Sequence, residues 1–206
     1  MQSGLACPSS ISDAHVLVTL YDRDLRVMLD EIAGPTPAPG AGAVSGVVIA
    51  MAAGLIASAA RRSDEWDEGK GVSAQAQALR SRVERLAEAN EEAYLEALAL
   101  IDGASEDGDR DQAIGKALDT AAELPLAIAE SACDVVLLGV EAAQHAAPGG
   151  AEDAAAAALL AEAAARAAGP SGEHRNRKHP ASLAAPARAP GLQAGVRTVA
   201  AELPGS

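Results

Sequence analysis

The feature that most constrains this chain is an uncharged run of 18 residues, from Ala43 to Ala60 (AVSGVVIAMAAGLIASAA). As a helix the run would span about 27 Å, close to the thickness of a bilayer core. More than half of its residues are Ala, Gly or Ser, however, so its hydrophobicity is weak. Small side chains let neighbouring helices approach closely. We therefore expect a buried core helix, with a membrane span as the alternative.

The rest of the chain also favours helices. Aromatic residues make up 1% of the sequence and Phe is absent, whereas alanine, the best helix former, is abundant. Apolar periodicity predicts further helices over residues 22–33, 73–101, 110–145 and 152–168, and Pro125 is expected to kink or restart the helix over 110–145. Short connections between them predict an all-α fold, an up-and-down bundle of about five helices.

Composition divides the chain into three parts. Residues 1–21 are expected to be an N-terminal extension and residues 22–169 the helical domain. Residues 170–206 hold five of the 11 prolines and show no apolar periodicity, so this C-terminal tail is expected to be disordered.

The charge pattern limits the partners. The net charge is −13 although the tail holds five basic and two acidic residues, so the helical body is strongly acidic. Nucleic acid is therefore not an expected partner, because phosphate contacts need clustered Lys and Arg. The two cysteines, Cys7 and Cys133, have no metal-ligand spacing, and no secretory signal is evident. We expect a cytoplasmic protein without a metal site or a membrane anchor.

The segment from Pro37 to Gly42 (PAPGAG) directly precedes the small-residue run. Its prolines hold the chain extended, and Gly40 and Gly42 permit close backbone approach or a positive φ. Unpaired amides at the following helix start can hold an anionic group. The alternative is that the segment is only a stiff connector.

Four carboxylates lie within or at the ends of predicted helices: Glu123, Glu130, Asp134 and Asp153. Such groups do acid–base work when burial shifts their pKa, although most carboxylates on helices are simply solvated. Glu130 stands out because it lies in a mostly apolar stretch, residues 126–133.

The order of these features resembles the cyclodeaminase/cyclohydrolase family, which includes formiminotransferase-cyclodeaminase domains and methenyltetrahydrofolate cyclohydrolases. The family has a Pro-Thr-Pro-Gly-Gly-Gly-Ser loop, a small-residue helix, and three later motifs in fixed order. The corresponding segments here are the loop Pro37 to Ala43, the helix Ser45 to Arg62, Asn90 to Tyr94 (NEEAY), Glu123 to Glu130 (ELPLAIAE) and Glu152 to Ala164 (EDAAAAALLAEAA).

The resemblance implies a homodimeric helical bundle that acts on a folate one-carbon derivative. The reaction would be hydrolysis of 5,10-methenyltetrahydrofolate or deamination of 5-formiminotetrahydrofolate, with the tetrahydrofolate derivative as substrate and no further cofactor. Pro39, Gly40 and Gly42 would place the substrate. Asp153 is the first candidate acid or base, and Glu130 the second.

In the alternative interpretation, the chain has the fold of the family but not its catalytic activity. Ala38, Ala41 and Ala43 stand where relatives carry Thr, Gly and Ser, so two loop hydroxyls are absent. The chain would then be a catalytically inactive family member that acts as a binding or scaffold protein.

Overall fold

The computed structural model describes residues 19–35, 39–102 and 108–168, apart from the side chains of residues 101–122. The described residues form five helices and no strand: α1 (Leu25–Ile32), α2 (Ala41–Arg61), α3 (Gly69–Asp102), α4 (Gly108–His145) and α5 (Gly150–Ala168). The predicted all-α class is confirmed, with each helix found within about one turn of its expected bounds. The tail at 170–206 and most of the N-terminal extension lie outside the described residues.

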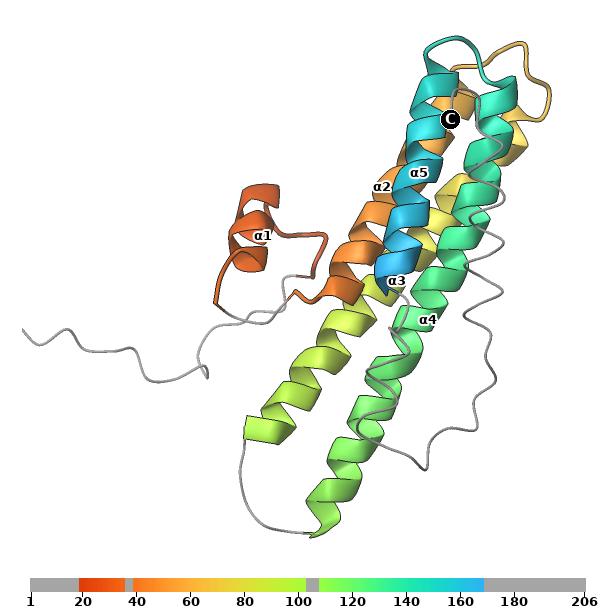
Figure 1. Ribbon diagram of the computed structural model, residues 1–206. Helices are drawn as coiled ribbons and strands as arrows, with labels where there is room; N and C mark the ends of the chain where they lie inside the picture. Colours follow the sequence, from red (N-terminus) through yellow and green to blue (C-terminus); the bar gives the residue numbers. More distant parts are fainter. Residues whose placement is uncertain (1–18, 36–38, 103–107, 169–206) are drawn as a thin grey trace, which may run out of the picture.

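Four of the helices make an up-and-down bundle (Figure 1). Consecutive helices run antiparallel, and each packs against the next, while α5 closes the ring against α2. α2 also contacts α4 across the diagonal, whereas α3 and α5 have no comparable contact among the described residues. The small-residue helix is therefore at the centre of the packing, touching all three other bundle helices.

Small side chains bring the bundle helices close together. A Cβ atom on Gly46 of α2 would lie 2.6 Å from the Cβ of Ala87 on α3, and one on Gly139 of α4 would lie 2.9 Å from the Cβ of Ala158 on α5. Both glycines thus sit where the neighbouring helix leaves no space for a side chain. Ile49 and Ile56 of α2, fully buried, fill the remaining core volume.

The burial of α2 favours a core helix over a membrane span for the uncharged run. α2 is long enough and, with a mean hydropathy of 2.1, apolar enough to cross a membrane. However, 67% of that window is buried inside the bundle. Packing of this kind is that of a core helix, as the abundance of Ala, Gly and Ser predicts.

α4 passes through Pro125 as a single helix. Of the two expectations at this proline, a kink or a restart, the restart is wrong, because the helix is continuous on both sides of it. After the proline, Ile128 and Val135 point into the core and are fully buried.

α1 lies beside the bundle, close to the first turn of α2 (Figure 1). Asp24 caps it by accepting a hydrogen bond from the amide of Arg26 at 2.8 Å. Of the apolar stripe on this helix, Met28 is buried, while Leu25, Leu29 and Ile32 are exposed. The helix is thus attached by one side chain and by the segment that precedes it.

Candidate active-site groove

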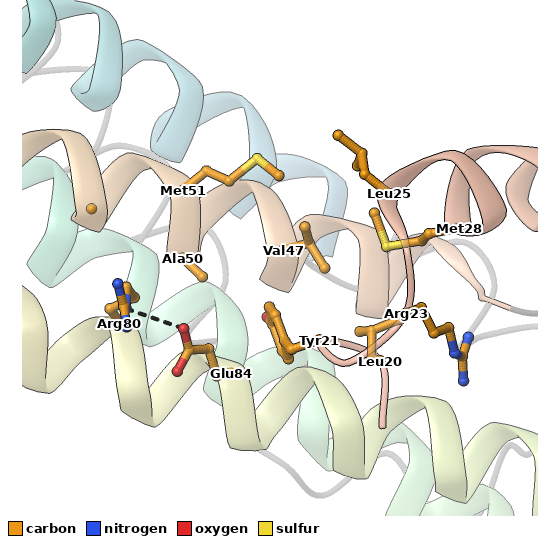
Figure 2. A pocket seen from close by; sticks show the side chains of 11 residues that line it. Leu20, Tyr21, Arg23, Leu25, Met28, Val47, Ala50, Met51, Arg80 and Glu84 are labelled. Carbon is orange, nitrogen blue, oxygen red and sulfur yellow. Dashed lines mark ion pairs between the residues drawn. The ribbon is translucent and has the colours of Figure 1, made fainter. Parts of the chain in front are cut away.

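A groove lies between the α1 region, α2 and α3 (Figure 2). Its volume is about 290 Å³, enough for a bicyclic ring or a molecule of similar size. Apolar side chains make up most of the wall, and the polar groups are few. The lining residues are Leu20, Tyr21, Arg23, Leu25, Met28, Val47, Ala50, Met51, Gly54, Arg80 and Glu84.

The α3 wall of the groove carries an ion pair. Arg80 and Glu84 are four residues apart, so the helix places them on one face, and Arg80 Nε lies 3.1 Å from Glu84 Oε1. Nε is buried but has no aligned hydrogen-bond partner among the described residues. Among the groove-lining residues, Glu84 is the one carboxylate.

Tyr21 faces this ion pair from the segment before α1 (Figure 2). Burial raises the pKa of its phenol, and the nearby carboxylates of Glu84 and Glu88 raise it further. The hydroxyl therefore stays protonated and acts as a hydrogen-bond donor at neutral pH. It is buried and, within the described part of the chain, has no hydrogen-bond partner.

Arg23 fastens the segment before α1 to α3. Its Nη1 and Nη2 donate to the two carboxylate oxygens of Glu91 at 2.7 and 2.8 Å, and Nη1 also lies 3.1 Å from Glu31 of α1. Burial alone would lower the pKa of Arg23, but the hydrogen bonds and charges of Glu91 and Glu31 outweigh it and raise the pKa. The guanidinium is thus a permanent clamp that holds one side of the groove in place.

The predicted substrate loop adjoins this clamp. Pro39 is buried, and Gly40 is the N-cap of α2, with an extended backbone (φ −80°, ψ 172°) and no side chain capping the helix. A Cβ on Gly42 would overlap the side-chain amide of Asn90, the residue before Glu91. The close approach of the Asn90 side chain, and not a positive φ, explains why residue 42 is a glycine. Asn90 lies against the loop, and the next residue, Glu91, binds Arg23, which lines the groove. These three residues connect the loop to the groove.

Asp153 lies at the other end of the molecule. It occupies the first turn of α5, where its carboxylate accepts a hydrogen bond from Arg62 at 2.7 Å, just after α2 ends. Because α2 has 21 residues, the length of that helix, about 30 Å, separates this pair from Gly40. Within one chain the structure does not bring Asp153 together with the loop.

Glu130, the second candidate acid or base, is on α4 and is half-buried. Burial raises the pKa of the neighbouring Cys133 thiol, with smaller contributions from Asp134 and Glu130. Neither Glu130 nor Asp153 lines the groove.

Sequence reasoning did not identify the groove residues Tyr21, Arg23, Arg80 and Glu84. The four-residue spacing of Arg80 and Glu84 was visible, but many such pairs on helices are merely solvated. Tyr21 and Arg23 become recognisable only when the segment before α1 folds back on α3, which is a long-range contact. In the described ranges, no group of three His, Cys, Asp or Glu side chains is placed to hold a metal ion.

Fold and groove together define a class: an up-and-down helical bundle with a small-residue central helix and a mostly apolar groove beside its first half. Residues 24–170 match the family model described as formiminotransferase-cyclodeaminase. The chain therefore belongs to the formiminotransferase-cyclodeaminase family, as its motifs suggested.

The comparison of structures agrees with this family. The fold is similar to that of formiminotetrahydrofolate cyclodeaminase from Thermotoga maritima, with a TM-score of 0.63 over 88% of this chain and 90% of that one. The two sequences are 19% identical, so this likeness concerns the fold. No curated protein matches the sequence.

Proposed function

We propose that this protein is a cytoplasmic folate one-carbon enzyme, with 5,10-methenyltetrahydrofolate or 5-formiminotetrahydrofolate as substrate and no further cofactor. The observation that carries the proposal is the family match across the whole bundle, residues 24–170. The groove adds support, because it offers a flat ring an apolar bed and a carboxylate beside it.

Both reactions need a group that moves protons. In hydrolysis, water adds to the methenyl carbon and loses a proton, and one carbon–nitrogen bond then breaks to leave a formyl group. In deamination, the second folate nitrogen attacks the formimino carbon and loses its proton, the formimino nitrogen takes up that proton and one more from solvent, and its bond to the carbon breaks to release ammonia. Glu84 is the carboxylate best placed to accept the proton from a substrate in the groove, and Arg80, 3.1 Å away, holds its orientation.

A homodimer would give Asp153 a role. Met51 is the middle residue of α2 and is exposed, as is Leu55 one turn later. Two copies paired antiparallel across this face would lay the first turn of one α2 beside the last turn of the other. Asp153 and Arg62 of one copy would then approach Gly40 and Gly42 of its partner. On this account the two halves of the site come from different copies.

The test is turnover of both substrates by the purified protein, followed by loss of methenyl absorbance and by release of ammonia. We expect acceleration over the spontaneous rate, and a loss of at least tenfold in Glu84→Gln, in the range seen for general acid–base groups. Glu96→Gln, an exposed carboxylate on the same helix, is the matched control. Asp153→Asn and Glu130→Gln complete the set.

If wild type accelerates neither reaction but still binds tetrahydrofolate, the chain is a non-catalytic family member that binds or scaffolds. The three alanines in the loop, at positions 38, 41 and 43, favour this second function. If turnover is lost in Asp153→Asn and kept in Glu84→Gln, the proton moves at the other end of α2.

A further inference from the structure

Two buried polar atoms stand out within the described part of the chain because they have no hydrogen-bond partner: Tyr21 Oη and Arg80 Nε. Both belong to side chains that line the groove. Buried donors are nearly always paired, since leaving one unpaired costs stability. The two donors face the same groove from different walls, and Arg80 Nε, although 3.1 Å from Glu84 Oε1, has no aligned hydrogen bond to it. Something else is therefore expected to supply the acceptor.

The polar groups that face the groove restrict the chemical class of the acceptor. Both atoms are donors, because the pKa of Tyr21 is raised by burial and an arginine carries no acceptor. Glu84 lies 3.1 Å from Arg80, and Glu84 and Glu88 are near enough to Tyr21 to raise its pKa. The two arginines of the lining, Arg23 and Arg80, are already paired with carboxylates, so the described lining of the groove offers an anion no free positive charge, and a neutral carbonyl oxygen or ring nitrogen fits better.

The apolar part of the groove surface restricts the shape and polarity of the rest of the ligand. Val47 and Ala50 of α2 and Leu20 of the segment before α1 present apolar surface to the same groove (Figure 2). Met51, also on the lining and 52% exposed, is a flexible side chain that can move to admit a ring. A flat, neutral ring with a carbonyl on one edge matches this combination of walls.

We infer that Tyr21 Oη and Arg80 Nε together bind the 4-oxo oxygen of a pterin ring, with the ring lying against Val47 and Ala50. This inference rests on the proposed function, because it takes folate as the ligand, and it assigns the groove to the pterin half of the molecule. Tyr21 and Arg80 are then residues that bind and orient the substrate.

The assignment is consistent with the proposed chemistry. In a pterin the 4-oxo oxygen lies next to N5, the nitrogen that bears the one-carbon unit. Donors that hold the oxygen therefore place N5 on the same side of the groove. Glu84, the partner of Arg80, is on that side as well. One short segment of α3 would thus supply the proton acceptor and, together with Tyr21 from the segment before α1, the recognition of the oxo oxygen.

The experiment compares tetrahydrofolate with its 4-amino-4-deoxy analogue, in which a donor replaces the oxo acceptor. Calorimetric titration of wild type should show about tenfold tighter binding of the oxo compound. Tyr21→Phe keeps the ring and removes the hydroxyl, so its preference should fall to threefold or less. Arg80→Lys keeps the charge and removes Nε, and should also reduce the preference.

Matched controls separate recognition from folding. Tyr94→Phe alters the tyrosine of α3 that is not on the groove, and Arg85→Lys alters an exposed arginine of the same helix. Both should keep the wild-type preference. The melting temperature of ligand-free Tyr21→Phe should not fall, because the hydroxyl it lacks was unpaired. A marked fall would mean that the hydroxyl serves the fold, and would overturn the inference.

The outcomes distinguish this inference from the function on which it rests. If the wild type turns over its substrate and Tyr21→Phe keeps the wild-type preference for the oxo compound, the proposed function holds. The inference that Tyr21 binds the pterin ring is then wrong. A wild type that prefers neither compound would also overturn the inference. Absence of any tetrahydrofolate binding would remove both the inference and the proposed function.

Discussion

Single atoms decide how closely the helices of this bundle approach. Gly46 and Gly54 are both inside α2, two turns apart, yet their surroundings are opposite. A Cβ on Gly46 would meet Ala87 at 2.6 Å, whereas one on Gly54 would meet nothing within 4 Å. The first glycine is required by the packing between helices, whereas the second faces open space on the groove.

We predict opposite effects of alanine at these two glycines. Gly46→Ala should lower the free energy of unfolding by about 1–3 kcal/mol, because it overpacks the α2–α3 contact. Gly54→Ala should raise it by about 0.5–1 kcal/mol, because alanine is the better helix former and no neighbour has to move. Urea unfolding monitored by circular dichroism measures both. Changes of the same sign would contradict the packing described for α2 and α3.

At the scale of elements, α1 is held beside the bundle by its buried Met28 and by a clamp in the segment before it. The bidentate pair of Arg23 with Glu91 joins the segment before α1 to α3. Glu91 is buried, and Arg23 is mostly so, with 19% of its side chain exposed. The exposed pair of Arg62 with Asp153 offers a comparison in which both partners are in contact with solvent.

Breaking the clamp should therefore lower the free energy of unfolding more than breaking the exposed pair does. We expect Glu91→Gln to lower the free energy of unfolding by about 1.5–3 kcal/mol, the range for hydrogen bonds to charged groups. Asp153→Asn should cost less than about 1 kcal/mol, as exposed ion pairs usually do. Limited proteolysis should also cut α1 of Glu91→Gln faster than α1 of wild type. Equal unfolding costs would show that the clamp does not hold the groove together.

Elements were also the level at which the sequence was most informative. Periodicity and composition predicted all five helices, because each has an apolar face or a long run of small residues. The apolar stripe of α1 was equally clear, but three of its four side chains are exposed, since this helix lies outside the bundle. The groove could not be predicted, because Arg23 and Glu91 meet only after the chain folds back over 68 residues.

At the scale of the whole molecule, the predicted site residues lie at two ends of one helix. Gly40 and Gly42 stand at the start of α2, and Asp153 stands near its end, paired with Arg62. Sequence order could not reveal this separation, because it is the antiparallel packing of α5 on α2 that sets it. Only a second copy, placed antiparallel, would bring the two ends together.

We predict that a charge on the outer face of α2 disrupts such a dimer. Leu55→Glu should shift the mass measured by size-exclusion chromatography with light scattering from two chains to one, because burying the charge is unfavourable. Leu137→Glu is the control, since Leu137 is also exposed but belongs to α4, which packs diagonally to α2. A wild type of one chain, or equal effects of both variants, would contradict the proposed pairing.

The central claim, that folate binds in the groove between the α1 region, α2 and α3, is tested most directly by hydrogen–deuterium exchange with and without tetrahydrofolate. We predict slower exchange in peptides covering residues 19–32, 41–54 and 80–91 when tetrahydrofolate is present. Protection confined to the peptides around Arg62 and Asp153, or no protection at all at saturating tetrahydrofolate, would contradict it.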